Sequence, residues 1–278
     1  MIENSLLFTS GSIGPVTLRN RTIRAAAFEG MCVDNGPSEA LYSYHTSVAA
    51  GGVGMTTVAY AAVSRSGLSF PTQLWMRQEI VPGLQKLTNG IHKEGAAASI
   101  QMGHCGNMSH RSICGCMPVS ASSGFNMYSP TFVRAMKKSE ILQMVKDFGK
   151  AAELAKESGF DAVEIHAGHG YLLSQFMSEW LNRRKDEYGG SFENRLRFTS
   201  QAVEEVMEVA TRNNLAVLVK MNMRDGFRGG MELDESLEVA RLLERLGVHA
   251  LVLRCLLYTS DAADDLHSAY LVGTSIIK

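Results

Sequence analysis

The chain has 278 residues, of which 45% are hydrophobic and 20% charged, and its formal net charge at pH 7 is -1. This length can bury the core of one large domain or two small ones, and the mixed charges exclude the basic surface typical of nucleic-acid-binding proteins. The start of the chain lacks the basic and apolar regions of a secretory signal, and the most apolar window, residues 48–63, is shorter than the ~20 residues of a membrane helix. We therefore expect a soluble, cytoplasmic enzyme without nucleic-acid or membrane partners.

Hydrophobic periodicity and glycine stops predict strands that alternate with helices along the chain. The expected strands are residues 20–28, 53–63, 96–102, 161–165, 215–222 and 248–254. The expected helices are residues 38–52, 79–94, 140–158, 192–213 and 234–246. Ser139 is the expected N-cap of the third helix, and its apolar stripe is Leu142, Val145, Phe148, Ala152 and Ala155. By the crossover rule the strands are parallel.

The pattern indicates an α/β fold of the TIM (β/α)8 barrel class. No GxGxxG turn follows the first strand, which argues against a doubly wound dinucleotide-binding sheet. Only about six βα units are present in the pattern, so we expect an incomplete barrel with open edges at its first and last strands.

The segment between residues 103 and 138 contains HCGNMSHRSICGCMPVSASSGF and is too long for a plain connector in a compact domain. We interpret it as a lid or a rim of the active site. The five cysteines have no spacing typical of a metal site, so we expect no metal; they are Cys32, Cys105, Cys114, Cys116 and Cys255. They are interpreted as reduced thiols, and the alternative is a reactive Cys105 near the active site.

The last residues, 255–278, do not continue the strand and helix pattern. Their first part, CLLYTSDAADD, resembles translated adaptor sequence at the end of a chain assembled from short reads. We therefore expect one truncated barrel domain over residues 1–254 and a non-native or disordered tail over 255–278. The alternative is a divergent terminal helix.

The densest chemistry lies in residues 161–197. The strand DAVEI is followed by His166, His169 and Tyr171, and chemical groups in parallel α/β proteins lie at the carboxyl ends of strands. Two imidazoles and a phenol at such an end indicate a place where a polar substrate atom is held and a proton is moved. The alternative is a cluster that only satisfies hydrogen bonds at the strand end.

Four motifs resemble the Old Yellow Enzyme family of FMN-dependent NAD(P)H oxidoreductases, including the bacterial branch related to dienoyl-CoA reductases. They are LFTSGSIGPVTLRNR, SIQMGHCG, EIHAGHGYLLSQF and NRRKDEYGGSFENRLRF, and the resemblance extends from Leu7 to about Arg254. It implies FMN across the carboxyl face of the barrel, NADH or NADPH as hydride donor, and reduction of the C=C bond of a small enone or enoate. It leaves a homo-oligomer open.

The resemblance also implies roles for individual residues. His166 and His169 would bind the substrate carbonyl, where enolate charge develops, and Tyr171 would protonate the α-carbon. A tyrosine with the usual pKa near ~10 is neutral at pH 7 and can act as an acid without a shift. The implied flavin contacts are Ala26, Ala27, Phe28, Tyr60, Gln101 and Lys220. Gln101 would bind the pyrimidine edge, and Lys220 would place positive charge near N1 and O2.

Three positions depart from the family pattern. Phe28 replaces a Thr or Cys and cannot form a hydrogen bond, Tyr60 is bulkier than the expected small residue, and Asn107 replaces a common Arg. The alternating charges of the central segment are interpreted as a salt-bridged loop rather than a basic substrate patch; they are Arg183, Arg184, Asp186, Glu193 and Arg195.

Two competing functions remain open from the sequence. One is a non-catalytic, truncated fragment that cannot retain FMN. The other is a barrel lyase that uses Lys220 as a Schiff base.

Overall fold

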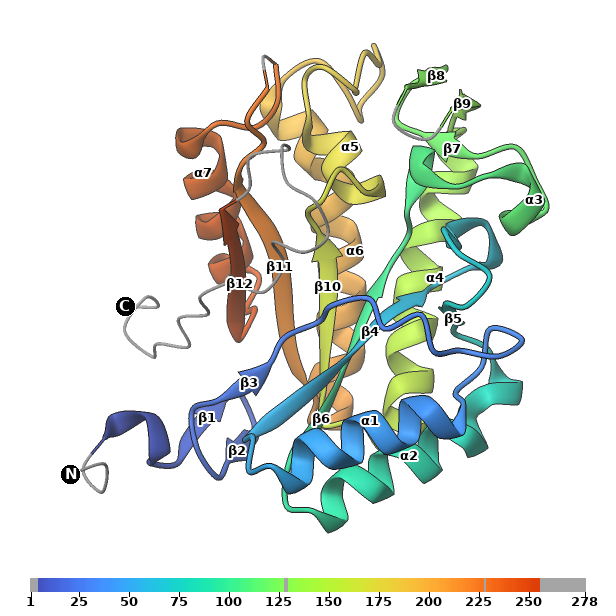
Figure 1. Ribbon diagram of the computed structural model, residues 1–278. Helices are drawn as coiled ribbons and strands as arrows, with labels where there is room; N and C mark the ends of the chain where they lie inside the picture. The colour runs from blue at the N-terminus through green and yellow to red at the C-terminus, as the bar shows by residue number, and fades with distance from the viewer. Residues whose placement is uncertain (1–4, 128–129, 228, 256–278) are drawn as a thin grey trace.

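A curved parallel sheet forms the centre of the computed structural model, which describes residues 5–127, 130–227 and 229–255 (Figure 1). Six strands follow one another in the order β12-β11-β10-β6-β4-β3, and a short seventh strand, β5, pairs with β4. Their bounds are β3 Ile23–Arg24, β4 Met55–Ala62, β5 Leu74–Trp75, β6 Ala97–Gly103, β10 Ala162–Ala167, β11 Ala216–Arg224 and β12 Ala250–Cys255. All neighbouring pairs are parallel, as predicted.

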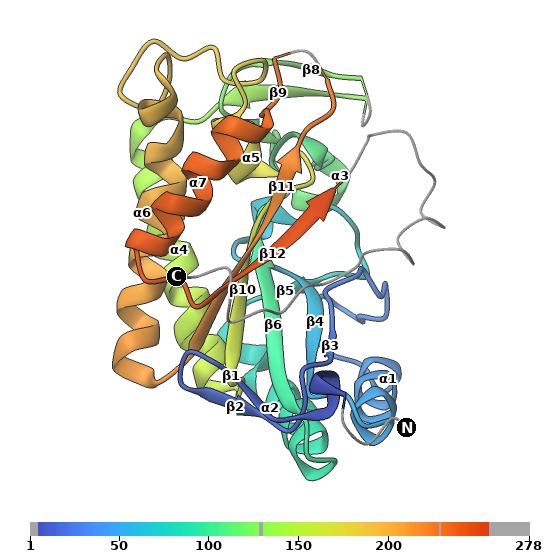
Figure 2. The ribbon, with the colours of Figure 1, turned by 90° about the vertical axis from the view of Figure 1, so that its left-hand side faces the viewer.

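Five long helices cover the outer side of this curved sheet (Figures 1 and 2). They are α1 Glu39–Ala50, α2 Val81–Lys93, α4 Lys138–Glu157, α6 Phe192–Asn213 and α7 Leu233–Arg245. Every residue of β4 and of β10 is buried, which is typical of parallel strands covered on both faces. Within the described residues the sheet ends at β3 and β12 and does not close, so the predicted incomplete barrel is confirmed.

Helix α6 shows how closely local sequence can fix an element. Ser191 is its N-cap, with the Ser191 hydroxyl accepting a hydrogen bond from the Asn194 backbone N–H at 3.3 Å. Asn214 ends it in the left-handed conformation, at φ 55°. Between these caps Phe198, Val203 and Val206 are fully buried, and the predicted bounds of the helix are confirmed.

Helix α4 corrects two expectations. Its N-cap is Lys137 and not Ser139: the Glu140 carboxylate accepts the Lys137 backbone N–H at 2.8 Å, which is one half of a capping box. Leu142 is 42% exposed, and the buried face instead runs through Ile141 and Met144. The apolar stripe therefore lies one residue earlier at its start than the sequence suggested.

Several shorter elements escaped prediction. The expected first strand is limited to β3, and before it a hairpin of β1 Gly11–Ile13 and β2 Val16–Leu18 packs against the amino ends of the central strands. The segment interpreted as a lid or a rim of the active site contains α3 Arg111–Cys114 and a small sheet of β7 Val119–Ser120, β8 Gly124–Asn126 and β9 Thr131–Ala135. The remaining short elements are α5 Leu172–Met177 and the 3-10 turns η1 Leu6–Phe8, η2 Arg65–Gly67, η3 Gln78–Ile80 and η4 Gly106–Met108.

The expected tail, apart from Cys255 at the end of β12, lies outside the described residues. Among the helices that are described, none combines the length and apolarity needed to cross a membrane.

Candidate active site

The carboxyl ends of the central strands carry most of the polar residues singled out in the sequence. His166 lies inside β10, where it is 3% exposed, and it is in register with Lys220 on the neighbouring β11. Glu164, two residues earlier on β10, is in register with Gln101 on β6. Residues two apart on a strand point to the same face, so this register brings the four side chains together.

The two histidines form a direct hydrogen bond. Nδ1 of His169 lies 2.8 Å from Nε2 of His166, and Nδ1 of His166 accepts the Gly168 backbone N–H at 3.2 Å. With its Nδ1 occupied as an acceptor, neutral His166 carries its proton on Nε2 and donates it to His169. Neutral His169 then carries its own proton on Nε2.

The backbone of His169 is held in an uncommon conformation. Its φ is 56°, in the left-handed region, and its N–H donates to Oδ1 of Asn222 at 3.2 Å. The Asn222 amide donates in turn to Asp225 at 2.8 Å, and the Asp225 carboxylate also accepts the Met231 backbone N–H at 2.8 Å. The end of β11 and the loop after it thus fix the position of His169, and sequence reasoning missed this role of Asn222.

Tyr171 completes an aromatic cluster at the start of α5. Its ring centroid lies 4.7 Å from that of His166 and 5.4 Å from that of Tyr60. Tyr60 is buried, its hydroxyl donates to the Gly67 carbonyl at 3.1 Å, and burial raises its pKa. Tyr60 therefore packs against the cluster on its buried side, while Tyr171 remains partly exposed.

A glycine at the end of β6 makes room for this cluster. A Cβ at Gly103 would lie 2.7 Å from the Tyr60 ring and 3.0 Å from Cβ of His166. Neither neighbour can move easily in a buried cluster, so a side chain here would displace the aromatic rings.

Gln101 and Lys220 occupy the buried floor of the same region. The Gln101 amide donates to Glu164 at 2.6 Å, and Nζ of Lys220 donates to the Ala26 carbonyl at 2.9 Å. Burial raises the pKa of Glu164, and the positive charge of Lys220 opposes this shift. Gln101, Glu164 and Lys220 are all at most 3% exposed.

This donor set suits the group that the sequence implied. The isoalloxazine ring of FMN offers hydrogen-bonding atoms along its pyrimidine edge and gathers negative charge near N1 when reduced. A primary amide and an ammonium group on adjacent parts of one buried surface, Gln101 and Lys220, match both requirements. The residues present therefore fit FMN.

The segment expected along the flavin has mixed exposure. Ala26 is buried, whereas Ala27 is exposed and Phe28 is 47% exposed, with its ring stacked on Phe70 at a centroid distance of 4.9 Å. Beside it, Arg24 and Glu29 form an ion pair at 2.6 Å, and Arg24 also donates to the Ala27 carbonyl at 3.1 Å. This ion pair, which was not predicted, connects the residues on either side of Ala26, Ala27 and Phe28.

Gln175 on α5 is a second residue that sequence reasoning missed. It is fully buried, and its amide N–H groups donate to the Gly170 carbonyl at 2.6 Å and to the Asn107 side chain at 2.8 Å. Its oxygen accepts from the Ser120 hydroxyl at 2.9 Å. Gln175 therefore joins the loops after β6 and β10 to the small sheet, and its place inside the motif EIHAGHGYLLSQF was the available signal.

The alternative of a reactive Cys105 is wrong. Cys105 is fully buried, and burial raises its thiol pKa to about 12, so almost no thiolate forms near neutral pH.

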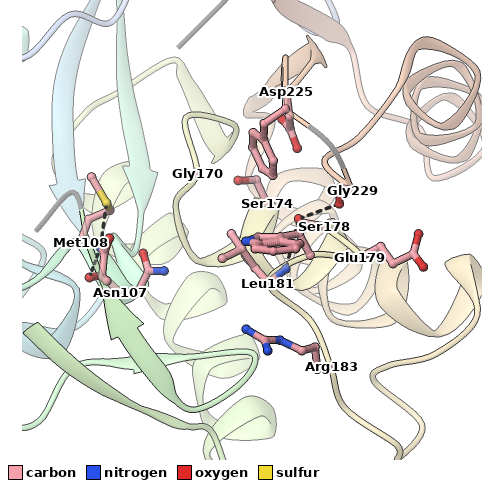
Figure 3. Close-up of a pocket in the computed structure, with 13 residues that line it drawn as sticks. Asn107, Met108, Gly170, Ser174, Ser178, Glu179, Leu181, Arg183, Asp225 and Gly229 are labelled. Atoms are coloured by element: carbon pink, nitrogen blue, oxygen red, sulfur yellow. Dashed lines mark hydrogen bonds between the residues drawn. The ribbon is translucent and has the colours of Figure 1, made fainter. Parts of the chain in front are cut away.

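The charged central segment separates into two kinds of residue. Arg184 pairs with Asp186 and Arg195 pairs with Glu235, both at 2.6 Å, as expected for a salt-bridged loop. Arg183 instead lines a pocket of about 990 Å³ beside the aromatic cluster (Figure 3). The pocket also includes Gly170, which lies between His169 and Tyr171, and Asn107, which replaces the expected Arg.

Comparison with known proteins gives consistent results. Residues 6–264 match the model of the NADH:flavin oxidoreductase / NADH oxidase family. The chain is 41% identical over 241 residues to the 4,4'-dithiodibutanoate disulfide reductase of Rhodococcus erythropolis, which covers 87% of this chain and 60% of that protein. It is 34% identical over 252 residues to an NADPH dehydrogenase of Listeria monocytogenes, covering 88% of this chain and 71% of that protein. The chain thus spans less than two thirds of the length of the Rhodococcus relative.

A solved structure shares the fold. The old yellow enzyme homologue from Zymomonas mobilis superposes with a TM-score of 0.82 at 26% identity, over 90% of this chain and 73% of that one.

Proposed function

The chain belongs to the NADH:flavin oxidoreductase / NADH oxidase family, whose cofactors are FMN and a nicotinamide nucleotide, and we propose that it reduces the C=C bond of α,β-unsaturated carbonyl compounds. The observation that carries this proposal is the cluster of His166, His169 and Tyr171 beside a floor that fits FMN. The enone or enoate substrate would lie between the cluster and the flavin.

The two histidines would polarise the substrate carbonyl. When bound, reduced FMN supplies a hydride to the β-carbon of the alkene, and negative charge then develops on the carbonyl oxygen. The Nε2–H of His169 would donate to that oxygen, and His166 would turn its N–H from His169 to the same atom. Donors placed before the reaction stabilise the enolate more than the ground-state carbonyl, which lowers the barrier.

Tyr171 would complete the reaction as the acid. Its hydroxyl donates a proton to the α-carbon, so that the hydride and the proton together saturate the double bond. The ring is packed against His166, at a centroid distance of 4.7 Å, so its hydroxyl has few orientations to sample.

Anaerobic incubation with NADH or NADPH and 2-cyclohexenone tests the proposal. We expect nicotinamide oxidation that depends on the enone and yields cyclohexanone, with cyclohexanone itself as the control that supports no oxidation. A rate of nicotinamide oxidation that depends on oxygen and does not change when the enone is added would instead indicate an oxidase.

A second candidate is disulfide reduction, which the 41% identity to a disulfide reductase favours. One hydride to a sulfur atom and one proton to the departing thiolate, from Tyr171, would cleave the S–S bond into two thiols. No carbonyl oxygen takes part in the cleavage of the S–S bond, so the proposed hydrogen bond from His169 is not needed. His169→Ala would therefore slow enone reduction while leaving disulfide reduction nearly unchanged.

The remaining alternative is a non-catalytic fragment. We propose that residues 1–254 form the FMN-binding domain and that residues 255–278 lie outside it. A chain that cannot retain FMN would overturn the enzyme proposal for this chain.

A further inference from the structure

We infer that the pocket beside the aromatic cluster binds a carboxylate at the far end of the substrate, through Arg183 and Trp180. This inference rests on the proposed function, since it assigns the class of molecule that the same site reduces. It would make the substrate an amphipathic acid: a reactive double bond, an apolar spacer and a carboxylate.

The charges that line the pocket favour an anion. Asp225 is 5% exposed, and both of its carboxylate oxygens accept hydrogen bonds from within the protein, from Asn222 and Met231. Figure 3 shows the Glu179 carboxylate directed away from the Arg183 guanidinium. Among the residues that the structure describes, no carboxylate lies within ion-pair distance of Arg183, whereas the next residue, Arg184, pairs with Asp186.

The backbone around Arg183 is anchored on two sides. The Arg183 backbone N–H donates to the Ser122 hydroxyl at 2.8 Å, next to the small sheet, and the Trp180 backbone N–H donates to the Gly229 carbonyl at 2.8 Å, in the loop after β11. The guanidinium lies over the Trp180 ring, 5.9 Å from its centroid. A cation–π contact with the indole restricts the Arg183 side chain without using its N–H groups, so less freedom is lost when the guanidinium binds a ligand.

The rest of the lining fits a hydrocarbon spacer. Met108, Leu181 and Phe227 supply apolar surface, and Trp180 is 60% exposed at the same pocket. Gly170 connects this surface to Tyr171. A planar guanidinium matches a carboxylate with two parallel hydrogen bonds, so a carboxylate fits the charged end better than a neutral polar group.

A matched pair of substrates tests the assignment. An acyclic enone with a carboxylate at the far end of its alkyl chain is compared with its methyl ester, and kcat/KM is measured for each. We expect the acid to be the better substrate, and Arg183→Gln to lower the ratio of acid to ester about 10-fold, as for a loss of ~1.4 kcal/mol of binding. Arg183→Lys keeps the charge but not the planar fork and should give an intermediate ratio.

Arg212→Gln is the matched control. Arg212 lies in the last turn of α6, and its side chain is 60% exposed. It does not line the pocket, so this substitution removes one positive charge without changing the proposed site. The acid to ester ratio should stay at the wild-type value. Equal kcat/KM for acid and ester in the wild type, unaffected by Arg183→Gln, would overturn the inference.

A binding measurement separates this inference from the proposed reaction. The saturated keto acid of the same length cannot be reduced, and its binding is followed by tryptophan fluorescence, since the chain contains only Trp75 and Trp180. We expect a change that Trp180→Phe abolishes and that needs about 10-fold more ligand in Arg183→Gln. Binding without turnover of any enone would refute the proposed function alone, whereas enone turnover without keto-acid binding would refute the anion site alone.

Discussion

Nε2 of His166 lies 2.8 Å from Nδ1 of His169, so the two rings proposed to hold a carbonyl are already hydrogen-bonded to each other. A substrate oxygen must therefore compete with His169 for the His166 proton.

His169→Asn should retain more enone reduction than His169→Ala. Asparagine can donate a hydrogen bond and tolerates the left-handed backbone at φ 56°, whereas alanine loses the donor and strains the backbone. We expect a loss of about 100-fold for alanine and about 10-fold or less for asparagine. Stopped-flow reoxidation of the reduced protein by 2-cyclohexenone measures both, and equal losses would exclude a donor role.

Tyr171→Phe should slow alkene reduction by about 100-fold or more while leaving flavin reduction by NAD(P)H nearly intact, because only alkene reduction needs the phenolic proton. The two half-reactions are followed separately in anaerobic stopped-flow experiments. Equal loss in both would remove Tyr171 as the acid.

Lys220→Met should lower the two-electron potential of bound FMN. The buried ammonium lies where the reduced flavin gathers negative charge, so its removal favours the oxidised form; a shift of ~30 mV corresponds to ~1.4 kcal/mol. Spectroelectrochemical titration measures the potential. Lys86→Met, which removes an exposed lysine paired with Glu39, is the control, and an equal potential in all three proteins would contradict this role.

The sequence predicted the elements that depend on local signals. The bounds of α6 follow from Ser191 and Asn214, and the parallel strand order follows from short crossovers. It could not predict contacts between distant segments: Gln175 binds Asn107 and Ser120, and Asn222 holds the backbone of His169. The cap of α4 was missed for a different reason: Ser139 is the common type of N-cap residue, but here the Glu140 carboxylate binds the Lys137 backbone N–H and the Arg134 side chain. The sequence showed that His166, His169 and Tyr171 lie in one segment. The distances between their side chains could be learned only from the folded structure.

His104 should make the protein less stable in acid. It is 1% exposed, its Nδ1 accepts the Gly106 N–H at 3.0 Å, and burial lowers its pKa to about 3 from 6.5. The unfolded chain therefore binds the extra proton first, so the stability present above pH 6.5 is lost progressively as the pH falls toward 3.

Urea unfolding at pH 7.5 and pH 5.0 checks this prediction. The contribution of His104 to the loss of unfolding free energy between these two values is ~2 kcal/mol. His104→Gln cannot titrate, so its loss should be smaller than that of the wild type by this amount. The same loss in both proteins would show that His104 does not govern the acid sensitivity.

The most direct test of FMN binding is the visible spectrum of the protein, expressed with this sequence and purified without added flavin, followed by denaturation to identify what is released. We expect a flavin spectrum that bleaches anaerobically with NADH or NADPH, and release of FMN. A colourless protein that remains colourless after incubation with FMN would contradict the enzyme proposal and support a non-catalytic fragment.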